Sequence, residues 1–138
     1  IDCNNRAWDL STQTRTAAED LEMLTAAHVS AYHWAVVGTE LNRMRATMLL
    51  AEVHALLGHG ETAMRLADEM RAYFVTRDDK PDWELAFTHV IHAHCAQTAG
   101  KTELHRRSYD QAVKAIAAIA ADEERKIVEQ TFRNVAAP

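Results

Sequence analysis

The sequence is poor in the residues that interrupt helices. Only four glycines and two prolines occur among 138 residues, and aromatic residues make up 7% of the chain. Glycine and proline are the two residues that disfavour a helix interior most strongly. Their scarcity, together with a hydrophobic content of 48%, predicts a single all-α domain over residues 1–138.

Cysteine is also nearly absent, since only Cys3 and Cys95 occur. Two thiols so far apart in the sequence match neither a zinc-binding pattern nor a C-x-x-C redox motif. The chain has no apolar run that approaches a transmembrane span and no signal-peptide pattern after Ile1. We therefore expect reduced thiols and a cytoplasmic protein, with one disulfide as the alternative.

Motifs that carry chemistry are missing as well. The sequence contains no H-E-x-x-H, no Glu-x-x-His pair, no glycine-rich phosphate loop and no serine-centred elbow. Zincin, di-iron, nucleotide-binding and serine-hydrolase sites therefore have no support. The net charge of −5 makes nucleic acid an unexpected partner.

Two amphipathic segments meet at Gly58 and form the central unit of the sequence. Apolar residues recur every three or four positions on both sides of this glycine: Leu41, Met44, Met48, Ala51, Ala55, Ala63, Leu66, Ala67, Met70 and Phe74. This period predicts helices over 41–57 and 61–76. Gly58 stands where a helix end takes a left-handed residue, so we expect a positive φ. Ala51, Ala63 and Ala67 are small enough for the two helices to cross closely.

The central hairpin repeats further along the chain. Gly58 and Gly100 are 42 positions apart, and the same shift aligns Ala51 with Ala93, Glu61 with Glu103, Arg65 with Arg107 and Asp68 with Asp110. A period near forty is typical of helical-hairpin repeats.

The other segments show similar helical patterns. We expect three hairpins, built from a short first helix with 17–37, then 41–57 with 61–76, then 82–99 with 102–120, followed by a terminal helix. Thr16 and Glu19 form a capping-box pattern before the second helix. Asp82 is expected to cap the helix that follows Pro81. Asp122 begins the terminal helix, unless the preceding helix continues into it.

The spacing of Ala51, Gly58, Ala63 and Ala67 resembles that of tetratricopeptide repeats, which are helix–turn–helix units. The resemblance covers roughly residues 41 to 117, although the second copy departs from the family at His105 and Tyr109. It implies antiparallel helical hairpins stacked as a right-handed superhelix.

A second resemblance lies near the start of the chain. Residues 27–34, with Asn4, Asn5 and Trp8 before them, are similar to small bacterial proteins of the same helical type. Those proteins carry no known activity, so this likeness implies a fold and no chemistry.

In tetratricopeptide domains the first helix of each hairpin lines a concave groove. By position, the resemblance implies that this groove contains Arg45, Glu52, Phe87, His94 and Gln97. Glu52 and His94 stand where some family members have asparagines that clamp the terminal carboxylate of a peptide, so that ligand is not implied. The implied function is a non-catalytic scaffold without a cofactor, which binds a protein or peptide partner or self-associates as a homodimer.

The eight histidines are the one unusual count in the sequence. A metal-dependent enzyme is therefore the alternative, because helical bundles of the DinB type collect three histidines from different helices. His28 or His33 with His89 and His92 would suit zinc or nickel. We favour histidines with local hydrogen bonds and expect no metal ion, and we interpret Cys95 as a buried residue rather than a nucleophile.

Overall fold

The computed structural model describes residues 2–138, and Ile1 lies outside the described residues. The helices are α1 (Cys3–Ser11), α2 (Ala17–Val37), α3 (Glu40–Leu56), α4 (Gly60–Val75), α5 (Asp82–Thr98), α6 (Thr102–Ala117) and α7 (Asp122–Phe132). The all-α expectation is confirmed, and α7 is a separate helix rather than a continuation of α6. Within residues 2–138, no helix combines the length and the apolar character needed to cross a bilayer.

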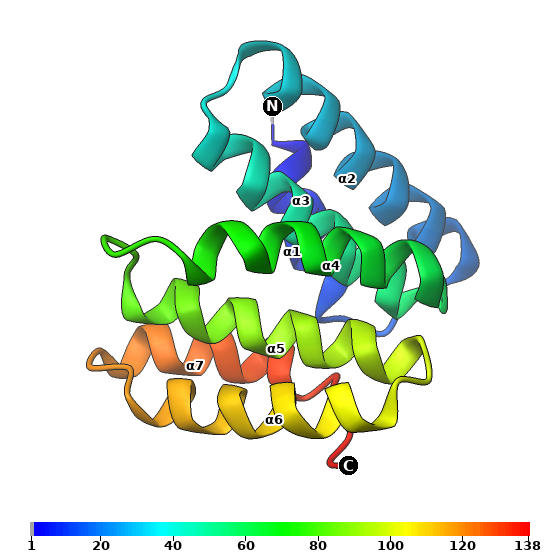
Figure 1. Cartoon of the computed structure of the whole chain (residues 1–138). Helices are drawn as coiled ribbons and strands as arrows, with labels where there is room; N and C mark the ends of the chain where they lie inside the picture. Colours follow the sequence, from blue (N-terminus) through cyan, green and yellow to red (C-terminus); the bar gives the residue numbers. More distant parts are fainter. Residues whose placement is uncertain (1) are drawn as a thin grey trace.

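Consecutive helices pack against one another along the chain, and the odd-numbered helices also make contact in the order α1, α3, α5 and α7. Figure 1 shows the stack running from α2 at one end to α6 and α7 at the other, with α7 behind α5. The odd-numbered helices therefore form one continuous layer, which we call the inner layer.

Small residues allow the helices of the central hairpin to approach closely. Ala51 of α3 and both Ala63 and Ala67 of α4 are completely buried, as their expected position at the helix crossing requires. Gly60 allows α4 to approach the end of α5 closely. A Cβ at this position would lie 2.7 Å from the carbonyl oxygen of Thr98. The first turn of α4 thus rests directly on the end of α5, which only glycine permits.

The two turns related by the 42-residue shift have the same backbone geometry. Gly58 has a φ of 80° and Gly100 a φ of 74°, which confirms the positive φ expected at Gly58. The N–H of His59 donates to the carbonyl of His54, and at the equivalent positions Lys101 donates to Ala96. Both turns therefore end their helix with a Schellman-type hydrogen bond.

Replacing Gly58 by alanine is expected to lower the free energy of unfolding by about 1 kcal/mol, because a positive φ strains any residue with a Cβ. No atom lies within 4 Å of a Cβ placed on Gly58 or on Gly100, so the cost comes from the backbone alone. Gly100→Ala is the matched variant and should cost the same. Urea unfolding measures both, and a Gly58→Ala protein as stable as the wild type would contradict this backbone account.

The helix starts agree with the sequence signals in one case and differ in another. Thr16 and Glu19 form the expected capping box at the start of α2. Asp82 does not cap α5: the cap position is Pro81, in an extended conformation, and it makes no side-chain cap hydrogen bond. The Asp82 carboxylate instead accepts from the N–H of Ala120 at 3.0 Å. It therefore links the start of α5 to the turn before α7.

Candidate functional site

An open cleft lies on the inner layer, between α1, α3, α5 and α7. Its volume is about 410 Å³, and its lining includes Trp8, Arg45, Met48, Trp83, Phe87 and Ile127. Each of the four inner helices contributes to this lining, so the cleft exists only when the hairpins are stacked. A concave, mainly apolar site with a few polar groups is the usual form of a ligand pocket.

Aromatic rings form one wall of the cleft. The ring centroids of Trp8 and Phe87 are 5.6 Å apart, and those of Trp83 and Phe87 are 6.3 Å apart. Ile127 of α7 lines the same cleft and is 55% exposed. Tryptophan and phenylalanine offer large apolar contact areas, so this wall suits an apolar side chain of a ligand.

Arg45 is the one basic residue among the polar residues that line the cleft, which also include Asn4, Asn5, Asp9, Thr12, Glu84, Gln130 and Thr131. Its Nε lies 2.7 Å and its Nη2 3.1 Å from the carboxylate oxygens of Glu84, which is buried. The hydrogen bond with Glu84 raises the pKa of Arg45 above its ordinary value, and the guanidinium lies 5.9 Å from the centre of the Trp83 ring. A guanidinium has five N–H donors, and Glu84 uses two of them. The remaining donors can serve a carbonyl or carboxylate of a ligand.

Beyond the cleft, the chain covers its own inner layer with residues 133–138. The N–H of Ala136 donates to Oε1 of Gln97 at 2.8 Å, and the carbonyl of Ala136 accepts from Nε2 of His105 at 2.8 Å. Val135 is buried beside these contacts, and Asn134 donates from Nδ2 to Glu52 at 3.3 Å. Side chains of α3, α5 and α6 therefore hold this segment.

The expected groove residues fall into two groups. Arg45 and Phe87 line the open cleft. Glu52 and His94 are buried against each other, with 2.8 Å between Oε1 and Nδ1, so neither faces a ligand. Gln97 is bound by Ala136. Of the five residues expected in a groove, two therefore line the open cleft, and the other three are buried or bound by the chain itself.

His94 and Glu52 form a buried pair in which the carboxylate favours the protonated imidazole. Burial lowers the pKa of His94, but the Glu52 carboxylate raises it through charge and a hydrogen bond, and the result is a pKa above the ordinary value. The two residues occupy equivalent positions 42 residues apart. Neighbouring hairpins therefore bring together the acid of one repeat and the imidazole of the next.

Three other histidines form a chain of imidazoles across α2, α3 and the turn before α4. Nε2 of His54 lies 3.3 Å from Nε2 of His28, and Nδ1 of His54 lies 2.9 Å from Nδ1 of His59. Burial, with the nearby His28 and His59, lowers the pKa of His54 to about 4. His54 is therefore neutral at pH 7.

The histidines considered for a metal site do not gather. His28 contacts His54, and His33 packs its ring against Trp34 with centroids 4.8 Å apart. His92 is held by two residues of other helices. Among residues 2–138, no group of three or more His, Cys, Asp or Glu is arranged to hold a metal ion.

His92 lies between a serine and an aspartate. Its Nδ1 is 2.7 Å from Oγ of Ser108, and its Nε2 is 3.0 Å from Oδ1 of Asp68. These are the residue types of a hydrolase triad, but Ser108 is only 1% exposed, so no substrate carbonyl can reach its hydroxyl. The arrangement joins α4, α5 and α6 through hydrogen bonds. Cys95 is equally unsuited to attack, because burial raises the pKa of its thiol.

Sequence reasoning did not identify most of the cleft. Trp8, Trp83 and Ile127 read as apolar positions of three separate helices, and no spacing rule connects them. Residues 133–138 carried no signal either, since they follow the terminal helix. No family model, curated protein or solved structure matches the chain.

Proposed function

We propose that the protein is a non-catalytic binding scaffold whose inner layer holds a segment of a partner protein in the open cleft. The observation that carries this proposal is the binding of Ala136. Both its N–H and its carbonyl are satisfied by side chains, from Gln97 of α5 and His105 of α6. Every non-proline residue of any peptide offers the same two groups, so side chains of α5 in the inner layer and of the neighbouring α6 have the chemistry to bind an extended chain.

The finer arrangement, a right-handed superhelix of the tetratricopeptide type, is part of the same proposal. It is supported by the similar turns at Gly58 and Gly100 and by the complete burial of the small residues Ala51 and Ala63. A cytoplasmic location is also proposed, and it is supported by the free thiols of the two cysteines in the described chain.

The chemistry of the cleft indicates the kind of segment it would take. Trp8, Phe87 and Ile127 belong to the apolar part of its lining, and Arg45 presents unused N–H donors in the same cleft. We infer a short peptide segment with one large apolar side chain, next to a main-chain carbonyl or a carboxylate that meets Arg45. The apolar side chain supplies the affinity, and the Arg45 contact fixes the direction of the segment.

Selection from a library of peptides displayed on phage tests this proposal. Selected peptides are synthesised and titrated into the protein, and tryptophan fluorescence reports binding because Trp8 and Trp83 line the cleft. Ile127→Arg places a charge at the rim and is expected to weaken binding at least about tenfold, which corresponds to about 1.4 kcal/mol.

Val113→Arg is the matched control, since Val113 is 47% and Ile127 55% exposed and Val113 does not line the cleft. It should bind as the wild type does. Peptides that bind Ile127→Arg as tightly as the wild type, or a selection that yields no binding peptide, would contradict the proposal.

A further inference from the structure

Residues 133–138, which follow α7, lie against α3, α5 and α6, and we call them the strap. Three side chains hold the strap, and we call them the seat: Glu52 of α3, Gln97 of α5 and His105 of α6. Figure 1 shows the end of the strap beside α6. The lining of the open cleft includes none of the seat residues. The seat is therefore a second surface, and it already holds a peptide segment.

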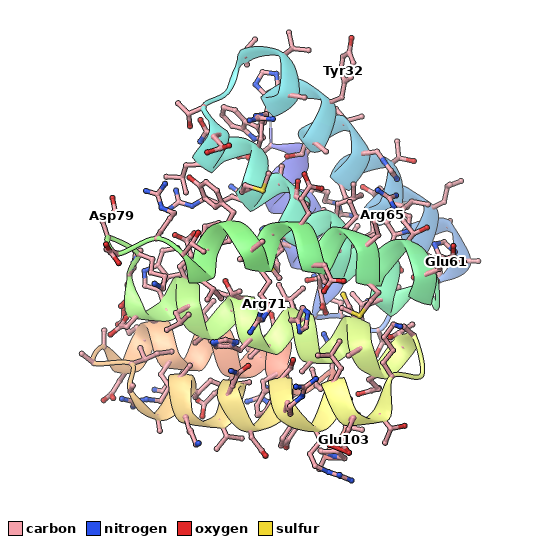
Figure 2. The ribbon with its side chains drawn as sticks, in the orientation of Figure 1. Tyr32, Glu61, Arg65, Arg71, Asp79 and Glu103 are labelled. Atoms are coloured by element: carbon pink, nitrogen blue, oxygen red, sulfur yellow. The ribbon has the colours of Figure 1, made fainter. Side chains whose placement is uncertain are left out.

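The seat side chains face the strap because of their positions on their helices. Figure 2 shows Glu103, near the start of α6, pointing away from the molecule. Two residues turn a helix by about 200°, so His105 faces the opposite way, and it is 8% exposed. Glu52 is completely buried. Two of the three seat side chains are thus shielded from water while the strap is in place.

The seat binds different polar groups of the strap in a fixed order along the chain. Glu52 accepts a hydrogen bond from the side chain of Asn134 at 3.3 Å. Oε1 of Gln97 accepts from the N–H of Ala136 at 2.8 Å, and Nε2 of His105 donates to the carbonyl of the same residue at 2.8 Å. The seat therefore recognises one donor side chain and the main chain of the residue two positions later.

Few contacts hold the strap in its seat. Val135 is the one buried side chain of the strap, at 7% exposure, whereas residues 133 and 136–138 are exposed. A segment with little buried apolar surface is among the first parts of a protein to open locally. Opening removes the strap's hydrogen bonds to Glu52 and His105, and polar groups in such positions need partners. The emptied seat therefore favours a segment that restores these hydrogen bonds.

We propose that the strap is the built-in occupant of a second peptide-binding site, and that a segment of a partner protein binds there by replacing it. This segment carries a donor side chain, then a β-branched aliphatic residue, then any residue except proline, as Asn134, Val135 and Ala136 do. The main-chain hydrogen bonds supply affinity for such a segment, and the aliphatic residue supplies selectivity. A second copy of the chain offers only the same strap, so exchange between copies gains no contact.

Binding of a fluorescent peptide to proteins with a weakened strap tests the proposal. The peptide has the sequence of residues 133–138, and its anisotropy reports binding to the 138-residue protein. The attached strap competes at a high effective concentration, so the wild type should bind the peptide weakly. Val135→Asp buries a charge and should release the strap, and this variant should bind the peptide at least tenfold more tightly.

Ala137→Asp is the matched control for Val135→Asp. It adds the same charge two positions away, at a strap residue that is exposed. The strap should stay seated, so this variant should bind the peptide as weakly as the wild type does. A peptide in which aspartate replaces the valine should bind to neither variant.

Ala136→Pro weakens the strap in a second way, without placing a charge near the seat. Proline has no N–H, so the hydrogen bond to Gln97 is lost while the seat itself is unchanged. This variant should bind the peptide at least about threefold more tightly than the wild type, the effect of one modest hydrogen bond. Circular dichroism checks that each strap variant folds.

Three results would overturn the proposal. One is a peptide that binds Val135→Asp and Ala136→Pro no better than the wild type up to about 1 mM. Another is unchanged binding when His105→Phe is added to Val135→Asp, since phenylalanine keeps a ring but has no N–H donor. The third is loss of binding when Ile127→Arg is added, because the seat should tolerate this change and the loss would place the peptide in the open cleft.

Sedimentation velocity separates a partner protein from a second copy as the occupant of the seat. The wild type should form no dimer that the peptide dissolves. Such a dimer would mean that the strap of a second copy occupies the seat, and it would overturn the assignment to a partner protein.

Discussion

Replacing Glu52 by alanine is expected to lower the free energy of unfolding by about 3–5 kcal/mol, the usual cost of breaking a buried charge pair. Glu52 is completely buried. Its carboxylate accepts from His94 at 2.8 Å and from Asn134 at 3.3 Å. Alanine would leave both groups without an acceptor and would create a cavity between α3 and α5.

Urea unfolding of a small set of variants tests this expectation. Glu69→Ala removes an exposed glutamate of α4 and should change stability by about 0.5 kcal/mol or less. Glu52→Gln keeps an acceptor and should cost less than Glu52→Ala. In the double variant with His94→Ala, the two losses should not add, because both remove the same contact. Full additivity would refute the pairing as a source of stability.

Lowering the pH from 7 to 5 is expected to cost roughly 2–3 kcal/mol of stability. Burial lowers the pKa of His54 to about 4, and burial also lowers the pKa of His89 to about 4. Positive charge near each imidazole adds to the effect, from His28 and His59 in the first case and from Arg71 in the second. Nδ1 of His89 is buried without a hydrogen-bond partner, so nothing in the described chain compensates its protonation.

The direction of this pH dependence follows from proton binding. Unfolded histidine has a pKa of about 6.5. Between about pH 6.5 and 4 the unfolded chain therefore binds more protons at these two positions than the folded chain does, and stability decreases as the pH is lowered. Each histidine would cost about 2 kcal/mol at pH 5, and solvent near His54 reduces its share. His94 acts in the opposite direction, because its pKa in the folded protein is raised. The stability that His94 contributes is therefore present at acid pH and is lost as the pH rises through this raised pKa. It offsets part of the acid loss.

Comparison of His89→Leu with His33→Gln isolates this effect. His89→Leu removes one titrating group from the core and should flatten the dependence of stability on pH. His33 is exposed on α2, so His33→Gln should keep the wild-type slope. Two results would contradict this expectation: a wild-type protein that is equally stable at pH 7 and pH 5, or a His89→Leu protein whose stability depends on pH as steeply as that of the wild type.

Local sequence signals predicted most of the helices, and tertiary contacts decided the rest. The helical period, the capping box at Thr16 and the position of Gly58 act over a few residues, so the sequence displays them directly. Asp82 was misjudged because a distant backbone group, the N–H of Ala120, competes for its carboxylate. No sequence pattern predicts a hydrogen bond between a carboxylate and a backbone N–H that lie far apart in the chain.

The candidate site also depends on tertiary contacts that local sequence signals do not reveal. Trp8 and Phe87 lie in different hairpins, and only stacking brings their rings to 5.6 Å. One tertiary contact did have a signal: Glu52 and His94 are equivalent residues of the 42-residue repeat. Equivalent positions of neighbouring hairpins lie side by side in a stack, so their opposite chemistry could have indicated the buried pair.

The central claim is that the cleft of the inner layer receives a peptide segment, and the indole N–H signals of the protein test it most directly. The sequence contains three tryptophans, of which Trp8 and Trp83 line the cleft and Trp34 does not. Titrating a selected peptide into ¹⁵N-labelled protein should move the Trp8 and Trp83 signals and leave Trp34 in place. Movement of Trp34 alone, with Trp8 and Trp83 unchanged at saturation, would contradict the account.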